Sequence, residues 1–495
     1  MAQKPYLTKS SYVRGITCQR LLWLGWHRRK PYHDPLPGSP AAVGTEIGNK
    51  AHHLFPGGVL VDEEPWQHAE AVARTRELMA DPSVPAIFEA AYENAGVRIR
   101  ADVMERLGEG RWGLREVKSA SRVKARYIDD AAVQTYVLEQ CGIGLGSIEL
   151  VHVNTSYIFP GETVSWTEYF QRTDIADKVH AALPEIADII DKQLMTLDNE
   201  TEPAVEPGPH CPAGCDYWEH CTADKPSDWI FHLPRLSQAK YDALRAAGIE
   251  RIRDIPTDFD LTGHQDRMRD VIVSGRHYVS ERLLSDLTQI DGPVAYLDFE
   301  AMNPAVPIYP GTHPYQRIPF QWSLHRDDGA GNLSHADFLA EPEMDPRHSF
   351  VASLTATLAE DEAPIIVYSS YEQSVLREMA ALFPAYANAL EQIIARLADL
   401  YVIVRNNVYL EGFAGSFSIK TVGKSLAPSL SYGDLDQVAD GAQAAAAFHR
   451  LAIGGLDFEE ANDIRAALLA YCRLDTLAMV KTHHGLRNLV MRDAA

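Results

Sequence analysis

The sequence contains no apolar run long enough to span a membrane, which takes about 20 residues as a helix. It also lacks internal repeats, low-complexity tracts and the GxxxxGK[ST] loop that binds the phosphates of ATP. The first residues, MAQKPYLTKSSYVRG, do not form the apolar core of a secretory signal peptide. We therefore expect a cytoplasmic protein without a membrane partner, in which any ATP-driven step belongs to another protein.

Cysteine is scarce, with 6 in 495 residues, and the formal net charge is −22. Disulfides are rare in the cytoplasm, so clustered cysteines there indicate metal or redox chemistry. The acidic total excludes a surface that is basic overall, but a nucleic-acid partner needs only a local basic track. Basic residues gather in residues 1–30 and 111–126, which are either such a track or ordinary solvated faces.

A chain of this length exceeds what one hydrophobic core usually holds, so several domains are expected. Residues 1–229 end in the cysteine loop HCPAGCDYWEHC and the polar stretch after it, and residues 230–285 form short helical patterns separated by prolines. Residues 286–495 begin with the apolar strand pattern of DGPVAYLDFE. The expected fold class is a multidomain α/β protein.

The first region carries acids inside two strand patterns, VRIRADVMERL and RWGLREVKSAS. Glu116 and Lys118 are two residues apart, so their side chains point to the same face of a strand. Asp102 on a neighbouring strand can join them, and two carboxylates on one face can hold Mg²⁺. A lysine beside the ion can position a water molecule and stabilise charge on a phosphate. The alternative is a surface ion pair and an acid in a turn.

These motifs, in this order, resemble the PD-(D/E)XK nucleases, in particular the RecB-like branch with an iron–sulfur cluster. That branch includes CRISPR-associated exonucleases and AddB-type helicase–nuclease subunits. The resemblance covers about residues 6–225. It implies a restriction-endonuclease-like α/β core in which Asp102, Glu116 and Lys118 form the catalytic centre. It adds a metal-proximal histidine in GNKAH and a downstream helix motif in QTYVL, which are His52 and then Gln134 and Tyr136. His52 is as well explained by a structural role.

Three cysteines stand within eleven positions, at Cys211, Cys215 and Cys221, and a fourth, Cys18, precedes the acidic motifs. This one-plus-three arrangement is that of the resembled branch, and it implies a [4Fe–4S] cluster that ties the start of the region to its end. A Cys₄ zinc site and four unliganded thiols are the alternatives. Cys141 and Cys472 lie in helical patterns and are expected in the core.

The last region carries a second set of acids. Asp298 and Glu300 end an apolar strand in PVAYLDFEAM, and Glu372 begins a helix after a second apolar strand. Tyr471 and Asp475 are four residues apart, so they share one face of a late helix. Four carboxylates around two metal ions can stabilise the attacking and leaving oxygens in phosphodiester hydrolysis.

This second set resembles the tyrosine-bearing DEDD exonucleases, which have an RNase H-like fold. The resemblance implies that Asp298, Glu300 and Asp475 bind metal and that Tyr471 orients the water. The segment GSFSIKTVGKSLAP resembles the one that precedes their third motif. The family has Asp where this chain has Glu372, and Asp399 is the alternative ligand. A degenerate module that only folds or grips nucleic acid is the other interpretation.

As a whole the chain resembles bacterial RecB-family proteins that fuse these two modules. We expect a Mg²⁺- or Mn²⁺-dependent DNA nuclease, an exonuclease with a preference for single strands, acting with a helicase or with repair or defence partners. An RNA-processing nuclease and a nucleic-acid-binding protein with vestigial sites are the alternatives. The middle segment LPRLSQAKYDALRAAGIERIRDIP is either a helix–hairpin–helix or a plain helical spacer.

Overall fold

The structure is a computed structural model that describes residues 4–31, 35–428, 430 and 438–493. By its internal contacts the chain forms two compact units. Unit 1 comprises residues 1–224 and 305–315, and unit 2 comprises residues 225–304 and 316–495. Both units combine helices with a mixed sheet, so the chain is a multidomain α/β protein, as the sequence predicts. Among the helices described, none is both long enough and apolar enough to pass through a bilayer.

The unit boundaries differ from the three regions expected from the sequence. Residues 230–285 belong to unit 2, where Arg267 donates to the carbonyl oxygen of Asn406 (2.9 Å). The short segment 305–315 belongs to unit 1 although it follows the first acid-bearing strand of unit 2. Its attachment is specific, because the Tyr169 hydroxyl donates to the carbonyl oxygen of Ala305 (2.9 Å).

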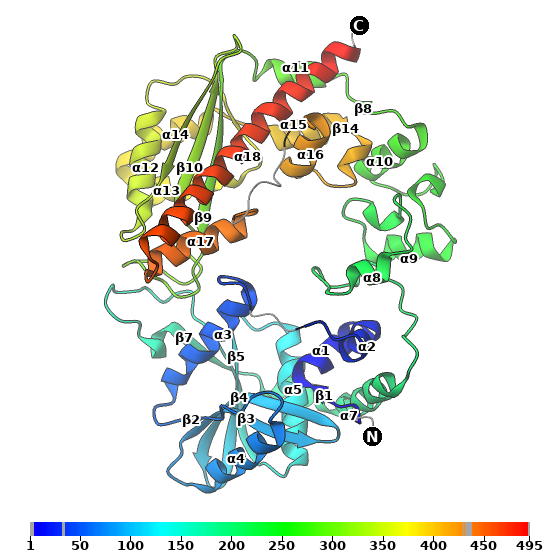
Figure 1. Ribbon diagram of the computed structural model, residues 1–495, viewed down its shortest axis with the longest axis vertical. Helices are drawn as coiled ribbons and strands as arrows, with labels where there is room; N and C mark the ends of the chain where they lie inside the picture. The colour runs from blue at the N-terminus through cyan, green and yellow to red at the C-terminus, as the bar shows by residue number, and fades with distance from the viewer. Residues whose placement is uncertain (1–3, 32–34, 429, 431–437, 494–495) are drawn as a thin grey trace. The chain divides into compact units, whose positions relative to one another are not determined.

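Unit 1 has a seven-stranded mixed sheet in the order β2-β3-β4-β5-β6-β7, with β1 paired to β4 (Figure 1). Its strands are β1 (Leu7–Thr8), β2 (Val59–Leu60), β3 (Ala86–Asn94), β4 (Val97–Gly108), β5 (Arg111–Lys118), β6 (Leu145–Val153) and β7 (Phe170–Asp174). Its helices are α1 (Lys9–Thr17), α2 (Gln19–His27), α3 (Pro40–Ala51), α4 (His68–Ala80), α5 (Ala125–Gln140), α6 (Trp166–Tyr169), α7 (Ala176–Asp198) and α8 (Trp218–Thr222).

Strands β4 and β5 form a tight hairpin whose two loop residues, Glu109 and Gly110, both have positive φ (53° and 72°). Paired left-handed residues of this kind match the twist of the flanking strands. The hairpin pairing runs from Gly108–Arg111 back to Val103–Arg115, and beyond it β4 pairs with β1 instead. A fork between β4 and β5 therefore opens just where Asp102 and Glu116 would face each other.

Unit 2 has a five-stranded mixed sheet in the order β11-β10-β9-β12-β13 and a separate β14-β8 pair. Its strands are β8 (Tyr278–Val279), β9 (Val294–Met302), β10 (Ile318–Asp327), β11 (Leu333–Leu339), β12 (Ile365–Val367), β13 (Leu397–Asp399) and β14 (Val408–Tyr409). Its helices are α9 (Gln238–Ala246), α10 (Gly263–Ser274), α11 (Leu283–Thr288), α12 (Pro346–Thr357), α13 (Tyr371–Leu382), α14 (Ala387–Ala395), α15 (Leu400–Asn407), α16 (Ile419–Leu426), α17 (Gly441–Ile453) and α18 (Phe458–Asp493).

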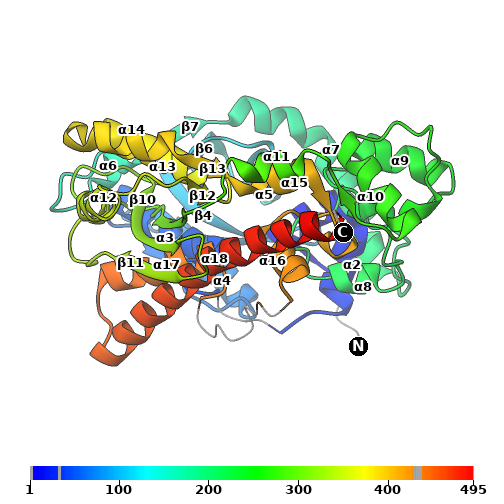
Figure 2. The same ribbon diagram turned by 90° about the horizontal axis from the view of Figure 1, so that it is seen from above.

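Strand β9 is the centre of this sheet, antiparallel to β10 and parallel to β12. Its side chains alternate between two environments, as a strand buried on both faces requires. Leu297 and Phe299 join the apolar cluster with α12, α13 and α14. Tyr296 and Asp298 point the other way, towards α18, and the Tyr296 hydroxyl bonds to His483 Nδ1 (2.8 Å). Figure 2 shows α13 and α14 on one side of the strands and α18 on the other.

Candidate metal centres

The first candidate centre lies in the fork of unit 1 between β4 and β5. Asp102 replaces the missing backbone pairing, because its Oδ2 accepts a hydrogen bond from the Val117 N–H at 2.7 Å. Glu116 is fully buried, and its Oε2 accepts a hydrogen bond from Gln134 Nε2 on α5 (2.6 Å). The structure thus brings Asp102, Glu116 and Gln134 together.

Two ammonium groups neutralise these acids. Lys118 Nζ lies 2.6 Å from Glu116 Oε1 and 2.6 Å from Asp130 Oδ2. Lys9 Nζ lies between the two strands, 3.1 Å from Asp102 Oδ1 and 3.0 Å from Glu116 Oε1. The pairing of β1 with the start of β4 places Lys9 there, as the first residue of α1. The position between the two carboxylates, where a divalent ion would sit, thus holds the ammonium of Lys9.

These contacts set the protonation of the acids. Burial alone would raise the pKa of Glu116, but Lys9 and Lys118 bring it down to about 2. Burial and the nearby Glu116 raise the pKa of Asp102. Burial alone would lower the pKa of Lys9, yet Asp102 and Glu116 raise it well above the ordinary value. Glu116 is therefore ionised at neutral pH, and it is paired with Lys9 and Lys118.

Glu89 on β3 is a further acid beside this centre. Burial, followed by the charge of Asp102, raises the pKa of Glu89 to about 7. Its φ of 53° is in the left-handed region, an uncommon conformation for a residue with a Cβ. Its neighbours Phe88 and Ala90 still pair with Val103 and Ala101 on β4. The strained backbone therefore turns one acid out of the regular alternation of the strand.

Two residues of the sequence motifs lie elsewhere. Tyr136 packs on the large apolar cluster of unit 1, because two residues along α5 turn it away from Gln134. The His52 ring stacks on Phe88, with the ring centres 3.9 Å apart and the planes nearly parallel (6°). Burial and the neighbouring His53 lower the pKa of His52. This stacking is a structural role next to the strand that carries Glu89.

The four predicted cysteines of unit 1 meet at one site. Cys18, Cys211, Cys215 and Cys221 line a single cavity with Tyr217 and other mostly apolar residues. Cys18 joins α1 to α2, and its Sγ accepts the Leu21 N–H that begins α2 (3.4 Å). Burial raises the pKa of Cys211, and the nearby Cys18 and Cys215 raise it further. Thiolates so close together need a cation between them, which fits a metal or a metal cluster.

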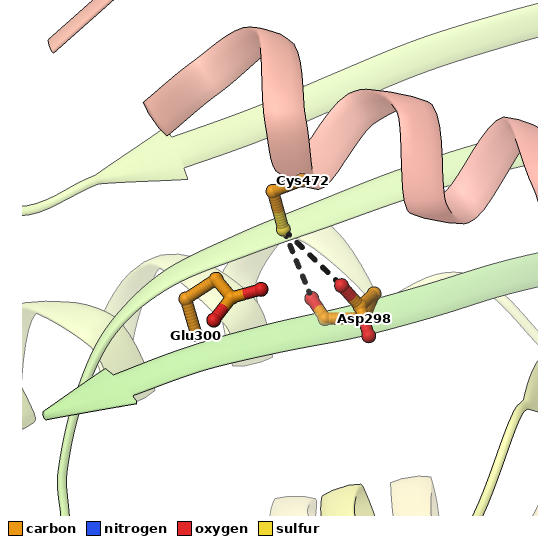
Figure 3. A group of neighbouring side chains, drawn as sticks. All are labelled: Asp298, Glu300 and Cys472. Carbon is orange, nitrogen blue, oxygen red and sulfur yellow. Dashed lines mark hydrogen bonds between the residues drawn. The ribbon is translucent and has the colours of Figure 1, made fainter. Parts of the chain in front are cut away.

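The second candidate centre lies in unit 2, between β9 and α18. Asp298 and Glu300 project from the same side of β9 towards Cys472 on α18 (Figure 3). The Cys472 thiol lies 3.5 Å from Asp298 Oδ2 and 3.9 Å from the Asp298 carbonyl oxygen. One atom from each of the three side chains can be chosen so that all lie within 4.8 Å of one another. This spacing is short enough for one ion to touch all three.

The helical pair expected from the sequence faces the same centre. Tyr471 and Asp475 are both buried on α18, and the Tyr471 hydroxyl donates a hydrogen bond to Asp475. Burial, then the charges of Asp475 and Glu300, raise the pKa of Tyr471 far above its usual value. Lys420 on α16 lies with its Nζ 5.2 Å from the Tyr471 ring centre, and its charge opposes the rise in the pKa of Glu300.

Glu372 and Asp399, the two alternatives for the fourth ligand, have different surroundings. Glu372 is buried at the start of α13, and its Oε2 has no hydrogen-bond partner among the described residues. Its charge raises the pKa values of both Asp298 and Glu300. Asp399 caps α15, with its Oδ1 accepting from the Tyr401 N–H at 2.9 Å. Glu372 therefore offers a buried oxygen without a hydrogen-bond partner, whereas one oxygen of Asp399 is occupied by the helix cap.

The acids of the second centre are crowded, and burial and mutual repulsion dominate their protonation. Burial and then Asp475 raise the pKa of Glu300 to about 8. Burial, opposed by a backbone hydrogen bond and reinforced by Asp399, raises the pKa of Glu372 to about 8. Burial, then Asp475 and Glu300, raise the pKa of Asp298 well above its usual value. In the absence of a cation, protons neutralise part of this centre, and a divalent ion bound there would replace those protons.

Three residues that lie at these centres were not predicted there from the sequence. Glu89 interrupts the apolar run AIFEAAY, the same signal that draws attention to Asp102 and Glu116, and it could have been found. Lys9 is 93 residues from Asp102 and gives no such signal, because β1 is only two residues long. Cys472 is buried as expected, but no pattern in the sequence indicates its contact with Asp298.

The family match that was found covers the first part of the sheet domain of unit 2 and the segment 305–315 of unit 1. A family model described as a domain of unknown function (DUF2779) matches residues 295–418. The match runs from β9 to the residue that caps α16, so it includes Asp298, Glu300 and Glu372 and ends before Tyr471. No similar protein was found among the curated proteins.

Proposed function

We propose that this protein is a metal-dependent nuclease with two hydrolytic centres, one in each unit, and that its substrate is DNA. The observation that carries the proposal is the convergence of buried acids in unit 2, where Asp298, Glu300 and Glu372 lie together on elements distant in sequence. Acids that are forced to hold protons at neutral pH are suited to binding Mg²⁺ or Mn²⁺. Bound there, such ions would stabilise the charge that develops on a phosphodiester.

The residues around this centre suit hydrolysis. Asp298, Glu300, Glu372 and Asp475 would hold the ions, and Tyr471, which bonds to Asp475, would orient the attacking water. The sheet also supports the resemblance to the DEDD exonucleases. Its central strand has an antiparallel hairpin on one side and two parallel strands on the other, the kind of sheet found in an RNase H-like domain.

Unit 1 supports the proposal independently. Asp102 and Glu116 would hold a divalent ion at the fork between β4 and β5, and Lys118 beside Glu116 would stabilise charge on the phosphate. Gln134 would orient Glu116 through its hydrogen bond. Order along the chain and side-chain proximity both agree with a RecB-like PD-(D/E)XK centre.

The cysteine site of unit 1 fits a [4Fe–4S] cluster. Four thiolates around a tetrahedral zinc ion lie against one another, with zinc–sulfur bonds of about 2.3 Å. Here the four cysteines line one small cavity, and the one-plus-three arrangement of the resembled branch favours a [4Fe–4S] cluster over zinc as their ligand. Anaerobically purified protein should contain about four iron atoms per chain. Cys18→Ser should lose that iron, and stoichiometric zinc without iron would contradict the assignment.

Cleavage of end-labelled DNA and RNA, single- and double-stranded, tests the function. The full chain is compared with Lys118→Ala, Asp298→Asn and the double variant, in Mg²⁺, Mn²⁺ and EDTA. Each single variant should lose one part of the cleavage by about 10²–10³-fold in rate, and the double variant should lose both. Cleavage of RNA but not DNA would assign the RNA-processing alternative. Metal-independent binding without any cleavage would leave a nucleic-acid-binding protein.

A further inference from the structure

A second hollow in unit 2, here called the arginine pocket, is not used by the acids described above. It is a cavity of about 600 Å³, lined among others by Arg235, His264, Tyr368, Tyr401, Arg405 and Phe417. Cavities of about 300–1,000 Å³ are the usual size for sites that bind small ligands. The pocket combines residues of the helical segment 230–285 with residues of the five-stranded domain.

The sheet places this pocket near the second centre. Tyr368 directly follows β12, and Tyr401 lies in the first turn of α15 after β13. Both strands run parallel to β9, so their carboxyl ends lie at the same edge as the carboxyl end of β9. Adjacent strands are about 4.8 Å apart, which puts the β13 end roughly 10 Å from β9. Crevices at the carboxyl ends of parallel strands are the usual ligand sites of such sheets.

The pocket carries positive charge without a counter-charge. Neither Arg235 nor Arg405 forms an ion pair within the part of the chain that the structure describes. The Nδ1 atom of His264 is buried and has no hydrogen-bond partner among the described residues. Burial, then the charges of Arg405, Arg267 and Arg235, lower the pKa of His264, so the positive potential of the arginines disfavours a charge on this imidazole. An anion such as a phosphate would relieve that repulsion and supply the missing partners.

Backbone strain supports a functional role for one of these residues. Arg235 has a φ of 52°, in the left-handed region that residues with a Cβ avoid. Such conformations cost on the order of 1–3 kcal/mol and persist where the surrounding structure holds them. Here Gln265 Nε2 bonds to the carbonyl oxygen of the preceding Pro234 at 3.0 Å, which fixes the turn that presents Arg235.

Aromatic rings form the other side of the pocket. Tyr401 meets Tyr368 edge to face, with ring centres 5.8 Å apart, and meets Phe417 in the same way at 6.5 Å. The Tyr368 hydroxyl donates to the carbonyl oxygen of Phe417 at 2.9 Å, so the rings are held in place. All three rings are half-buried. Fixed aromatic rings next to basic groups are the means by which proteins hold the bases and phosphates of single strands.

We propose that the arginine pocket binds one nucleotide of a single strand, with the phosphate on Arg235, His264 and Arg405 and the base against Tyr401 and Phe417. The inference rests on the proposed nuclease function, and it adds the form of the substrate. The pocket holds an unpaired strand, and a neighbouring phosphodiester of that strand lies at the acids of β9. The helical segment 230–285 is then part of the substrate site and not only a spacer.

Binding without cleavage tests this proposal. Fluorescent single strands of ten nucleotides are titrated with the full chain in EDTA, over a series of salt concentrations. Arg405→Gln and Arg235→Gln are the test variants, and Arg377→Gln, an exposed arginine on α13 away from the pocket, is the matched control. Because unit 1 is identical in all variants, differences between them report on the pocket alone.

Each test variant should bind the strand about 10-fold more weakly, and Arg405→Gln should make the salt slope shallower by about 0.7, the value for one lost single-strand phosphate contact. Tyr401→Leu should weaken binding by a similar factor with the slope unchanged, since stacking carries no charge. Arg377→Gln should match the wild type in both measures. Arg235 is exposed, so its variant keeps the proposal testable if Arg405→Gln fails to fold.

Two results would overturn the proposal. The first is that both arginine variants bind the strand like Arg377→Gln, while Asp298→Asn still reduces the cleavage of end-labelled strands. The nuclease function would then stand, and the pocket would not be its substrate site. The second is that a free nucleoside monophosphate binds as tightly as the ten-nucleotide strand and competes with it, which would assign the pocket to a small ligand. Absence of both binding and cleavage would remove the nuclease function together with this inference.

Discussion

The two acid centres solve the same electrostatic problem in opposite ways. In unit 1, Asp102 and Glu116 are paired with the ammonium groups of Lys9 and Lys118 at 2.6–3.1 Å. In unit 2, the acids of β9 meet a thiol, a phenol and other acids, and the charge of Lys420 offsets only part of the rise in the pKa of Glu300. The first centre is charged and internally satisfied, whereas the second is neutralised by protons.

This difference separates a site that is complete without metal from one that is not. A buried acid paired with cations keeps its charge and contributes to stability, but any incoming ion must compete with those cations. Crowded acids that hold protons destabilise the folded state as soon as they ionise, and an incoming ion relieves that cost. Adding metal, changing the pH or substituting one acid should therefore change the stability of the two units in opposite directions.

The largest effect is expected from Glu116→Gln. The substitution keeps the shape but leaves Lys9 and Lys118 without their shared partner, although Glu116 is fully buried and the lysine side chains are only about one-fifth exposed (18% and 21%). Removing one partner of a buried ion pair typically costs about 3–5 kcal/mol. Urea denaturation of the full chain should show that loss for unit 1, with hydrogen exchange of β5 peptides identifying the unit.

Glu300→Gln is the matched substitution in unit 2. At pH 8 it should raise the stability of unit 2 by about 2–3 kcal/mol, because it removes one of several acids that repel one another. The exchange of β9 peptides reports this change. If both substitutions shift stability in the same direction, the contrast between the two centres is wrong.

The pH dependence of the two units should also be opposite. Glu300 and Glu372 have pKa values raised to about 8, so the stability of unit 2 is full below the ordinary glutamate pKa of 4.5 and falls as the pH rises towards 8. At about 1.4 kcal/mol for each unit of pKa shift, the loss should amount to several kcal/mol, and saturating Mg²⁺ should reverse it. Glu116 has its pKa lowered to about 2, so its contribution to unit 1 is full above pH 4.5 and is lost as the pH falls towards 2. Melting curves resolved by unit, from pH 2 to pH 9, check both signs.

The sequence predicts much of both centres because strand and helix periods are local. Glu116 and Lys118 are two residues apart, which predicts that they share one face of a strand, and their side chains do form an ion pair. The spacing of four likewise placed Tyr471 against Asp475. Tyr136 was expected from the resemblance alone, and it packs partly buried against the apolar cluster of unit 1, because only two residues separate it from Gln134 on a helix.

What the sequence could not supply are contacts made by strand pairing at long range. Lys9 reaches Asp102 only because the two residues of β1 pair with the start of β4. The arginine pocket requires residues 230–285 to pack on the sheet domain, for which Arg235 and His264 carry no periodic signal. The balance of charge at each centre follows from these contacts, so it could be read only from the structure.

Lys9→Met should change the affinity of the unit 1 centre for a divalent ion. In the wild type a divalent ion at Asp102 and Glu116 competes with the Lys9 ammonium, which lies between the two carboxylates. Without that ammonium, Mn²⁺ should bind unit 1 about 10-fold more tightly, equivalent to about 1.4 kcal/mol. Calorimetric titration in a Glu300→Gln background separates this centre from that of unit 2. Lys4→Met, an exposed lysine on the same segment, is the control and should bind Mn²⁺ as the background does. Weaker binding in Lys9→Met would show that the ammonium assists the ion.

The smallest effects should come from Asp399, and they decide which acid completes the second centre. Asp399 caps α15 through the Tyr401 N–H, and asparagine caps a helix about as well as aspartate, so Asp399→Asn should change stability by only a few tenths of a kcal/mol. Asp399→Ala should cost about 1 kcal/mol, the usual loss for a missing cap. Neither change should alter the rise in melting temperature of unit 2 on adding Mg²⁺. Glu372→Gln should reduce that rise, because Glu372 is the acid with an unused buried oxygen and with charge acting on Asp298 and Glu300. The opposite result is a smaller Mg²⁺-dependent rise in melting temperature for Asp399→Asn and an unchanged rise for Glu372→Gln. It would show that Asp399, which caps α15, is the metal ligand and that Glu372 is not.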